Sequence, residues 1–237
     1  MTAVGHTVAI MQPYFCPYVG YFQLIAAADT FVIYDDVQFT KKGWINRNRL
    51  LQGGGDALFT IPVKAASDFL DVRERELAPD FDRRRLLNRV REAYRRAPQF
   101  AAVFPLVESV VQHPDPNLFG YILHSVRQVC GYLGLRTPLR VSSTVPIAPG
   151  LKGRDRVVAT CQALGATRYL NAIGGTALYD REDFRAAGLD LRFLRPRLVE
   201  YPQLGEPFVP WLSIIDVLMF NPVDEARRVV EHEYELT

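Results

Sequence analysis

The sequence lacks the features of several protein classes. Its three cysteines, Cys16, Cys130 and Cys161, are widely spaced and odd in number, which argues against a disulfide framework and against zinc-ligand spacing. No apolar run approaches the roughly 20 residues that a membrane-spanning helix requires. The first fifteen residues also lack the basic region and long apolar block of a secretory signal. We therefore expect a cytoplasmic protein with no membrane insertion.

The sequence also carries little net charge. The formal value is +2, which argues against a nucleic-acid partner because phosphate binding depends on a basic surface. Only four of the 28 basic residues are lysines, and the rest are arginines. A coding preference for arginine accounts for most of this skew. The remaining lysines still draw attention, because ammonium and guanidinium groups are not interchangeable at a site.

Familiar catalytic motifs are absent as well. The four histidines, His6, His113, His124 and His232, fall in separate segments, and there is no G-x-S-x-G, P-loop, G-x-G-x-x-G or metal-ligand spacing. The sequence therefore predicts no metal site and does not identify a cofactor. Cys16 lies in the first predicted turn, where a nucleophilic role is conceivable but not favoured.

The segments that are present predict an α/β protein. Short apolar stretches at residues 7–12, 30–34, 139–144, 167–173 and 189–194 read as strands, and helical patterns lie between them. This alternation predicts a Rossmann-like sheet of about five mostly parallel strands, wound on both faces. With 49% hydrophobic residues over 237 positions, we expect one domain spanning residues 1–237.

A long insertion is expected after the second strand, over residues 46–135. The stretches "RNRLLQ", "GGGD" and "ALFTIPV" predict a hairpin, "DVREREL" a further extended piece, and three helices follow. The first of these helices carries seven arginines opposite its apolar stripe: Arg83, Arg84, Arg85, Arg89, Arg91, Arg95 and Arg96. A solvated face is the simplest interpretation. The acidic surface of an acyl carrier protein is the alternative partner.

Ligands of doubly wound sheets bind beyond the carboxyl ends of the strands. The stretch "YDDVQFTKKGWINRNR", Tyr34 to Arg49, follows the second strand. Asp35 and Asp36 should point to opposite faces, so one of them can face the crevice and orient or deprotonate an acceptor. Together with Gln38 they are the catalytic candidates, and a turn cap is the alternative.

The same stretch supplies candidates for substrate binding. Asn46 and Asn48 offer donors and acceptors, Arg47 a fork for a carboxylate or phosphate, Lys42 a point charge and Trp44 an apolar wall. This set suits a polar small molecule such as a sugar or nucleotide. An ordinary polar surface hairpin is the alternative.

Other strand ends supply further substrate-binding candidates, each with a plainer alternative. A glycine that opens a helix, such as Gly20, lets backbone N–H groups bind an anion. Cations at a helix N-terminus, such as Lys152 and Arg154, oppose the helix macrodipole and are therefore placed to bind an anion. A carboxylate inside an apolar helix, such as Asp216, needs a partner if it is buried. The alternatives are packing, tight turns and solvent exposure. The candidates are Gln12, Tyr18, Gly20 and Tyr21, then Lys152 and Arg154, then Gly174 and Gly175, and finally Gln203 and Asp216.

One family resemblance covers nearly the whole chain. The block "AIMQPYFCPYVGYFQLIAAADTFVIYDDVQFTKKGWINRNRLL" resembles the WbqC-like family, as do "FTIPVK", "LGATRYLNAIGGTALYD", "EYPQL" and "LSIIDVL". Members typically occur with bacterial surface-polysaccharide (O-antigen) and specialised-metabolite pathways, and their reaction is poorly defined. The family usually has an aromatic where this chain has Cys16, which counts against a nucleophilic role there. Matching positions are Gln12, Gly20, Asp35, Asp36, Gln38, Trp44, Asn46, Arg47, Asn48, Gly174, Gln203 and Asp216.

A weaker resemblance concerns the layout of pantothenate synthetase and related nucleotidylyl transferases. That layout has a His-x-Gly-His turn between strand and helix and a Gln-Phe pair after the next strand. Here Tyr18 and Tyr21 replace the two histidines, and Gln38 and Phe39 form the pair. Because those histidines stabilise phosphate charge in the family, the replacement puts adenylyl transfer in doubt.

These observations lead to two functional hypotheses. The first is a group-transfer enzyme, moving an acyl, aminoacyl or nucleotidyl group to a small polar acceptor in surface-polysaccharide or specialised-metabolite biosynthesis. Its substrate would be a sugar, an amine or a nucleotide-linked molecule. The alternative is a non-catalytic module that binds a nucleotide-sugar or a carrier-bound intermediate. The absence of a catalytic histidine and of an activated cysteine favours this alternative.

Overall fold

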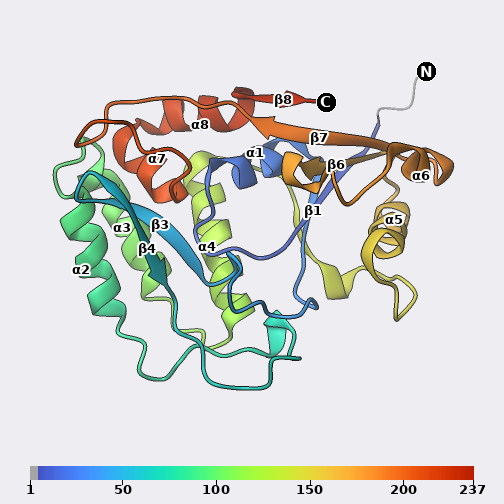
Figure 1. The fold of residues 1–237 in the computed structure, drawn as a ribbon, viewed down its shortest axis with the longest axis horizontal. Coiled ribbons are helices and arrows are strands. Elements are labelled where there is room, and N and C mark those ends of the chain that lie inside the picture. The colour runs from blue at the N-terminus through green and yellow to red at the C-terminus, as the bar shows by residue number, and fades with distance from the viewer. Residues whose placement is uncertain (1–4) are drawn as a thin grey trace.

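The computed structural model describes residues 5–237 and places a six-stranded sheet at the centre of the fold (Figure 1). The strand order is β5-β2-β1-β6-β7-β8, in which the first five are parallel and β8 is antiparallel to β7. Their bounds are β1 Thr7–Met11, β2 Thr30–Ile33, β5 Leu139–Val141, β6 Arg168–Ala172, β7 Asp190–Pro196 and β8 Tyr234–Leu236. This confirms the Rossmann-like, mostly parallel sheet and adds one short strand that the sequence did not predict.

The strand order reverses at β1. Chain connections run outward from β1 through β2 to β5, and from β6 outward on the other side to β7. The switch point therefore lies at the carboxyl ends of β1 and β6, the place where doubly wound sheets leave a crevice for ligands.

Helices cover both faces of the sheet, as alternating side chains require. On one face, Ala9 and Phe31 pack with α1 (Val19–Ala27), α4 (Leu118–Leu133), α7 (Ile214–Phe220) and α8 (Val223–His232). On the other, Val8 and Val32 pack with α5 (Gly153–Ala163) and α6 (Arg181–Ala186). In Figure 1, α5 and α6 stand well apart from the α1–α7–α8 group.

The segment between β2 and β5 forms an antiparallel hairpin and three helices. The hairpin pairs β3 (Arg47–Gln52) with β4 (Gly55–Thr60), and α2 (Arg83–Tyr94), α3 (Phe100–Val111) and α4 follow it. Pro105 lies inside α3. The extended piece expected at residues 71–77 is instead interrupted by a 3-10 helix, η1 (Val72–Glu74), because the Asp71 amide donates to the Glu74 carboxylate at 2.8 Å and caps a turn. Apolar side chains of the insertion continue the core of the first sheet face.

A buried glutamine joins the two ends of the described chain. Gln23 on α1 is fully buried, and its amide donates to the carbonyls of Val229 (3.0 Å) and Glu233 (2.8 Å) at the end of α8. These carbonyls belong to the last helical turn, where intrahelical donors run out. The bonds therefore fasten α8 and the following β8 to the first helix.

Candidate functional site

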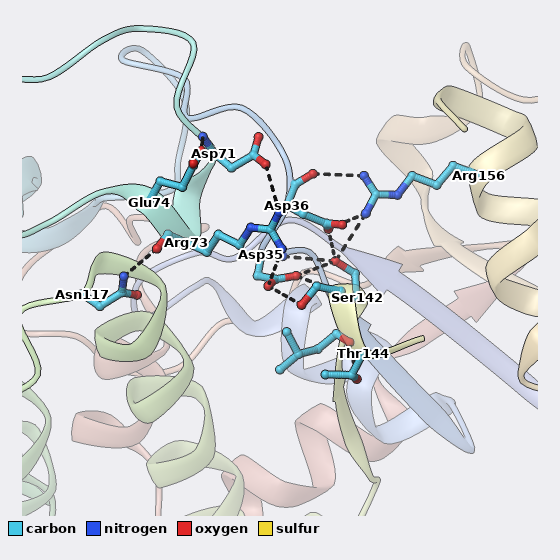
Figure 2. Close-up of polar contacts among 11 residues, drawn as sticks. Asp35, Asp36, Asp71, Arg73, Glu74, Asn117, Ser142, Thr144 and Arg156 are labelled. Atoms are coloured by element: carbon cyan, nitrogen blue, oxygen red, sulfur yellow. Dashed lines mark hydrogen bonds and ion pairs between the residues drawn. The ribbon is translucent and has the colours of Figure 1, made fainter. Parts of the chain in front are cut away.

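The sheet register brings the ends of β1, β2 and β5 together. Met11 pairs with Ile33, and Ile33 pairs with Val141, so the residues that follow each strand emerge at one edge. There the structure gathers Asp35, Asp36, Ser142 and Arg156 (Figure 2), together with Ser143, which bonds Asp35, and we call these five residues the polar cluster. The serines come from η2 (Ser142–Thr144), the short 3-10 turn after β5, and the arginine from the first turn of α5.

Asp35 is the buried carboxylate of the polar cluster, with 4% exposure. Its Oδ1 accepts from the Ser142 hydroxyl (2.8 Å) and the Ser143 amide (3.0 Å), and its Oδ2 accepts from the Ser143 hydroxyl (2.6 Å). These donors satisfy a group that would otherwise be costly to bury. Asp35 therefore orients the two serines.

Asp36 is the accessible carboxylate, with a side chain 22% exposed. Arg156 donates to its carboxylate and, at 3.0 Å, to its backbone carbonyl, and the Ser142 hydroxyl also contacts the carboxylate. Burial alone would raise the pKa of Asp36, but the Ser142 bond and the Arg156 charge outweigh it and hold that pKa below its usual range. Asp36 is thus ionised at neutral pH and faces solvent.

Ser142 stands between the two carboxylates. Its hydroxyl oxygen lies within hydrogen-bonding distance of an oxygen on each of them and accepts from the Asp35 amide at 3.2 Å. A hydroxyl has one proton to donate, so it can serve only one carboxylate at a time. A second guanidinium, that of Arg73 on η1, approaches Asp35 at 3.9 Å and Asp71 at 3.8 Å (Figure 2). Two carboxylates and two guanidinium groups therefore lie close to the Ser142 hydroxyl.

A small cavity of about 210 Å³ opens beside the same part of the sheet. It lies at the β1–α1 loop, and we call it the aromatic pocket. The loop before α7 and the start of the hairpin complete it. Its lining residues are Tyr14, Pro17, Tyr18, Trp44, Asn48, Arg49 and Trp211.

Two sequence features shape the pocket walls. Gly20 makes room for Tyr18, because a Cβ on Gly20 would lie 2.6 Å from the Tyr18 ring. The buried Asn48 amide donates to the Cys16 carbonyl at 2.7 Å, which fixes the β1–α1 loop to β3. Gly20 therefore allows the Tyr18 ring to pack against the helix, and Asn48 positions the β1–α1 loop.

Asp216 and Gln203 fix the loop before α7, which carries Trp211 into the wall of the aromatic pocket. Asp216 is fully buried in α7, and its Oδ2 accepts from the Tyr201 hydroxyl (2.7 Å) and the Gln203 amide (2.8 Å). Gln203 also bonds both backbone groups of Val209, closing the loop that carries Trp211. Burial raises the pKa of Asp216, while its hydrogen bonds oppose that shift.

The remaining residues predicted from the hairpin segment have mainly backbone partners. The exposed Gln38 donates to the Asp68 carbonyl (2.7 Å), the buried Asn46 donates to the Ile61 carbonyl (2.7 Å), and Arg47 donates to the Gly43 carbonyl at 2.8 Å. Arg47 also contacts the carbonyl of Lys42, whose own side chain is exposed. These residues shape the loop between the polar cluster and the aromatic pocket.

Residues predicted at the first strand end divide between core and pocket. Tyr21 is fully buried and donates to the Gln12 carbonyl at 3.0 Å. The side-chain carbonyl of Gln12 accepts from the Tyr14 hydroxyl at 3.2 Å, behind the pocket wall. Tyr18 reaches the pocket itself.

Residues predicted at the later strand ends lie outside the pocket lining. Arg154 pairs with Asp183 at 2.6 Å, and the exposed Lys152 precedes the first residue of α5. Gly174 is exposed, whereas Gly175 is buried, where a Cβ would lie 2.2 Å from the Asn171 amide. Of the three cations that open α5, it is Arg156 that reaches the polar cluster, and the anion it meets is the chain's own Asp36.

Cys16 is buried in the β1–α1 loop. Burial raises the pKa of the Cys16 thiol to about 12, which leaves it protonated at neutral pH. His113 and His124, the histidine pair, stack with ring centroids 3.8 Å apart on the insertion. Within residues 5–237 no three histidine, cysteine or acidic side chains are grouped to hold a metal ion.

Sequence reasoning missed several residues of both features. Ser142 and Ser143 end a predicted strand without a distinctive motif, and only tertiary pairing brings them to Asp35. Tyr14 and Arg49 also line the aromatic pocket, although they were not among the predicted site residues. Trp211 gave no signal, although two tryptophans in a whole chain are few enough to follow up.

Comparisons with known proteins agree with this description. The family model described as "WbqC-like protein family" matches residues 12–228. The chain belongs to the WbqC-like protein family. A relative from Mycobacterium tuberculosis (strain ATCC 25618 / H37Rv), the "Uncharacterized protein Rv1507c", is 33% identical over 224 residues, covering 92% of this chain and 95% of the relative. No solved structure matches the chain.

Membership of the WbqC-like family supports a biosynthesis-related role and leaves the reaction open. The matched range includes both carboxylates of the polar cluster and all seven residues that line the aromatic pocket. Across the described part of the chain, none of the helices is long and apolar enough to cross a bilayer.

Proposed function

We propose that this chain is a group-transfer enzyme, which moves an acyl, aminoacyl or nucleotidyl group to a small polar acceptor in bacterial surface-polysaccharide or specialised-metabolite biosynthesis. The observation that carries the proposal is the polar cluster at the carboxyl ends of β2 and β5, where an ionised, solvent-facing Asp36 is held by Arg156. Among the ion pairs of residues 5–237 this one has the least exposed cation, since the Arg156 side chain is 16% exposed and the next, that of Arg49, is 30% exposed.

The lowered pKa of Asp36 favours one role over another. A general base works best with a pKa near the working pH, whereas Asp36 is held below its usual range. Asp36 therefore orients the amine or hydroxyl of the acceptor and stabilises positive charge that develops on it. Asp35 positions the serines, and Arg156 is placed to meet an anionic group of the donor when that group displaces part of its contact with Asp36.

The donor and pathway follow from other features. Family membership supports the biosynthetic setting. Arginines of α2 offer a docking face for an acidic acyl carrier protein, since the one ion pair that they form within residues 5–237 is Arg95 to Glu92 at 3.7 Å. The small polar substrate itself would enter from the aromatic pocket.

Complementation tests the catalytic assignment. A strain lacking the gene receives Asp36→Asn, Arg47→Ala or the matched control Asp155→Asn, an exposed carboxylate that pairs with Arg154. We expect Asp36→Asn to lower pathway product at least tenfold with little change in melting temperature, and Asp155→Asn to behave as the wild type. If Asp36→Asn and Arg47→Ala both retain full pathway activity, the assignment is wrong.

A non-catalytic binding module remains the second candidate, and one observation favours it. Both carboxylates of the polar cluster are already hydrogen-bonded within the chain, and the buried Cys16 thiol is protonated. A ligand that binds tightly to the purified chain, and is recovered unchanged after incubation with every donor class, would support this candidate over transfer.

A further inference from the structure

Both tryptophans of the chain stand at the aromatic pocket. Trp44 is 44% exposed and Trp211 is 40% exposed. Large apolar side chains that are exposed together around a cavity mark binding surfaces. Tyr18 meets Trp211 edge to face, with ring centroids 6.3 Å apart, and Tyr14 adds a fourth ring. Four aromatic walls suit a flat ring, because aromatic groups stack on one another's faces and edges.

The charge around the pocket selects against cations. No carboxylate lines the pocket in the described part of the chain. The guanidinium groups of Arg47 and Arg49 each lie 5.7 Å from the centroid of the Trp44 ring. Arg49 shares its charge with Asp56 at 3.2 Å. Arg47 donates only to backbone carbonyls of the preceding turn and forms no ion pair with residues 5–237. A cationic ring would be repelled, and an anionic group beside the ring would be attracted.

The hydroxyls of the pocket keep their protons at neutral pH. Burial raises the pKa of Tyr18, and burial together with Tyr18 raises the pKa of Tyr14. The Tyr14 hydroxyl already donates to Gln12 at 3.2 Å, whereas that of Tyr18 has no hydrogen-bond partner among the described residues. Tyr18 can therefore offer a neutral hydrogen bond to the polar edge of a ring.

The size of the pocket limits its occupant. Its volume of about 210 Å³ is below the roughly 300–1,000 Å³ of pockets that enclose drug-sized ligands. One ring fits, and the substituents of that ring must extend toward solvent and the arginines. The pocket lies at the carboxyl end of β1, beside the switch point of the sheet.

We infer that the aromatic pocket binds one flat, uncharged aromatic ring that carries an anionic group. Two sources share this chemistry: a nucleoside monophosphate unit and an aromatic carboxylic acid. As the place where a substrate of group transfer is held, the inference rests on the proposed function. As a binding site it stands independently, because it requires no turnover.

Intrinsic tryptophan fluorescence gives a direct test, since both fluorophores lie at this pocket. The purified chain is titrated with AMP, UMP and benzoate, and with two partial ligands: adenosine, which lacks the anion, and ribose 5-phosphate, which lacks the aromatic ring. Saturable quenching by the nucleotides or by benzoate identifies the source. Adenosine should bind more weakly than AMP, and ribose 5-phosphate should leave the emission unchanged.

Variants complete the test by calorimetric titration with the best ligand. Trp44→Ala should weaken binding roughly 5- to 150-fold, the range expected for loss of one stacking partner, and Trp211→Phe should retain most of it. Phe69→Ala, an aromatic 86% exposed and outside the pocket lining, is the matched control. Equal affinity for ribose 5-phosphate and AMP, or no binding of any aromatic anion at millimolar concentration, overturns the inference. Binding is measured here without turnover, so a loss of pathway activity alone leaves the inference intact.

Discussion

Replacing Tyr201 by phenylalanine should destabilise the chain in a pH-dependent way. The change removes only the hydroxyl that donates to Asp216 Oδ2 at 2.7 Å. Leaving a buried acceptor without its donor costs about 1–3 kcal/mol, and Asp216 is fully buried, so water cannot replace the lost donor. We expect a loss of about 2 kcal/mol. At about 2–4 °C per kcal/mol for a chain of this size, the melting temperature should fall by roughly 4–8 °C.

The pH dependence follows from the raised pKa of Asp216. A carboxyl whose pKa is higher in the folded state binds more protons there than in the unfolded chain. Its stabilising contribution is present below the unfolded pKa and is lost as pH rises through the folded pKa. Removing the Tyr201 hydroxyl, which lowers that pKa, extends this loss to higher pH. The deficit of Tyr201→Phe should therefore be larger at neutral pH than in mild acid.

Urea unfolding of wild type and variant at several pH values measures both quantities. Tyr132→Phe is the matched control, because the Tyr132 hydroxyl forms no hydrogen bond among residues 5–237. It should change stability by less than about 0.5 kcal/mol at every pH. A deficit of Tyr201→Phe that is the same in mild acid and at neutral pH would refute the effect of the Tyr201 hydroxyl on the pKa of Asp216, and one below about 0.5 kcal/mol would refute the bond itself.

Three further changes test other parts of the structure. Gly20→Ala should cost about 1–3 kcal/mol and alter tryptophan emission, since the new methyl meets the Tyr18 ring; unchanged unfolding and emission would contradict this. Arg156→Met should raise the pKa of Asp36, which Arg156 now lowers, and shift the loss of its stabilising contribution to higher pH; an unmoved NMR titration refutes the pairing. His124, whose pKa burial and its stacked partner lower, should make the chain less stable as pH falls below about 6.5, and His124→Phe should flatten that dependence in urea unfolding.

Much of the sheet could be predicted because its strands are locally marked. Residues 30–34 and 167–173 combine β-branched and aromatic residues between turn residues, and both form strands as predicted. The stretch Tyr234–Leu236 carries no such pattern. It pairs with β7 because the preceding helix α8 ends beside that strand. Its strand conformation therefore depends on tertiary packing and not on its local sequence.

The candidate site divides in the same way. Sequence placed Asp35 and Asp36 after a buried strand and at the correct edge of the sheet. It could not show that Ser142 and Arg156, more than 100 residues later, satisfy them. Gln203 and Asp216 stood out as polar residues in apolar surroundings, and the structure brings them into contact with each other at 2.8 Å.

The bond from Gln23 to the end of α8 has a consequence for biosynthesis of the chain itself. Helix α1 leaves the ribosome well before α8, because the carbonyls that accept from the buried Gln23 amide lie 206 and 210 residues later. The central strand β1 likewise waits for β6. Domains tend to fold as units during synthesis, and here the contact between α1 and α8 forms only after α8 has emerged. A nascent chain stalled before residue 223 should therefore hold an exposed α1 and be a natural client for chaperones.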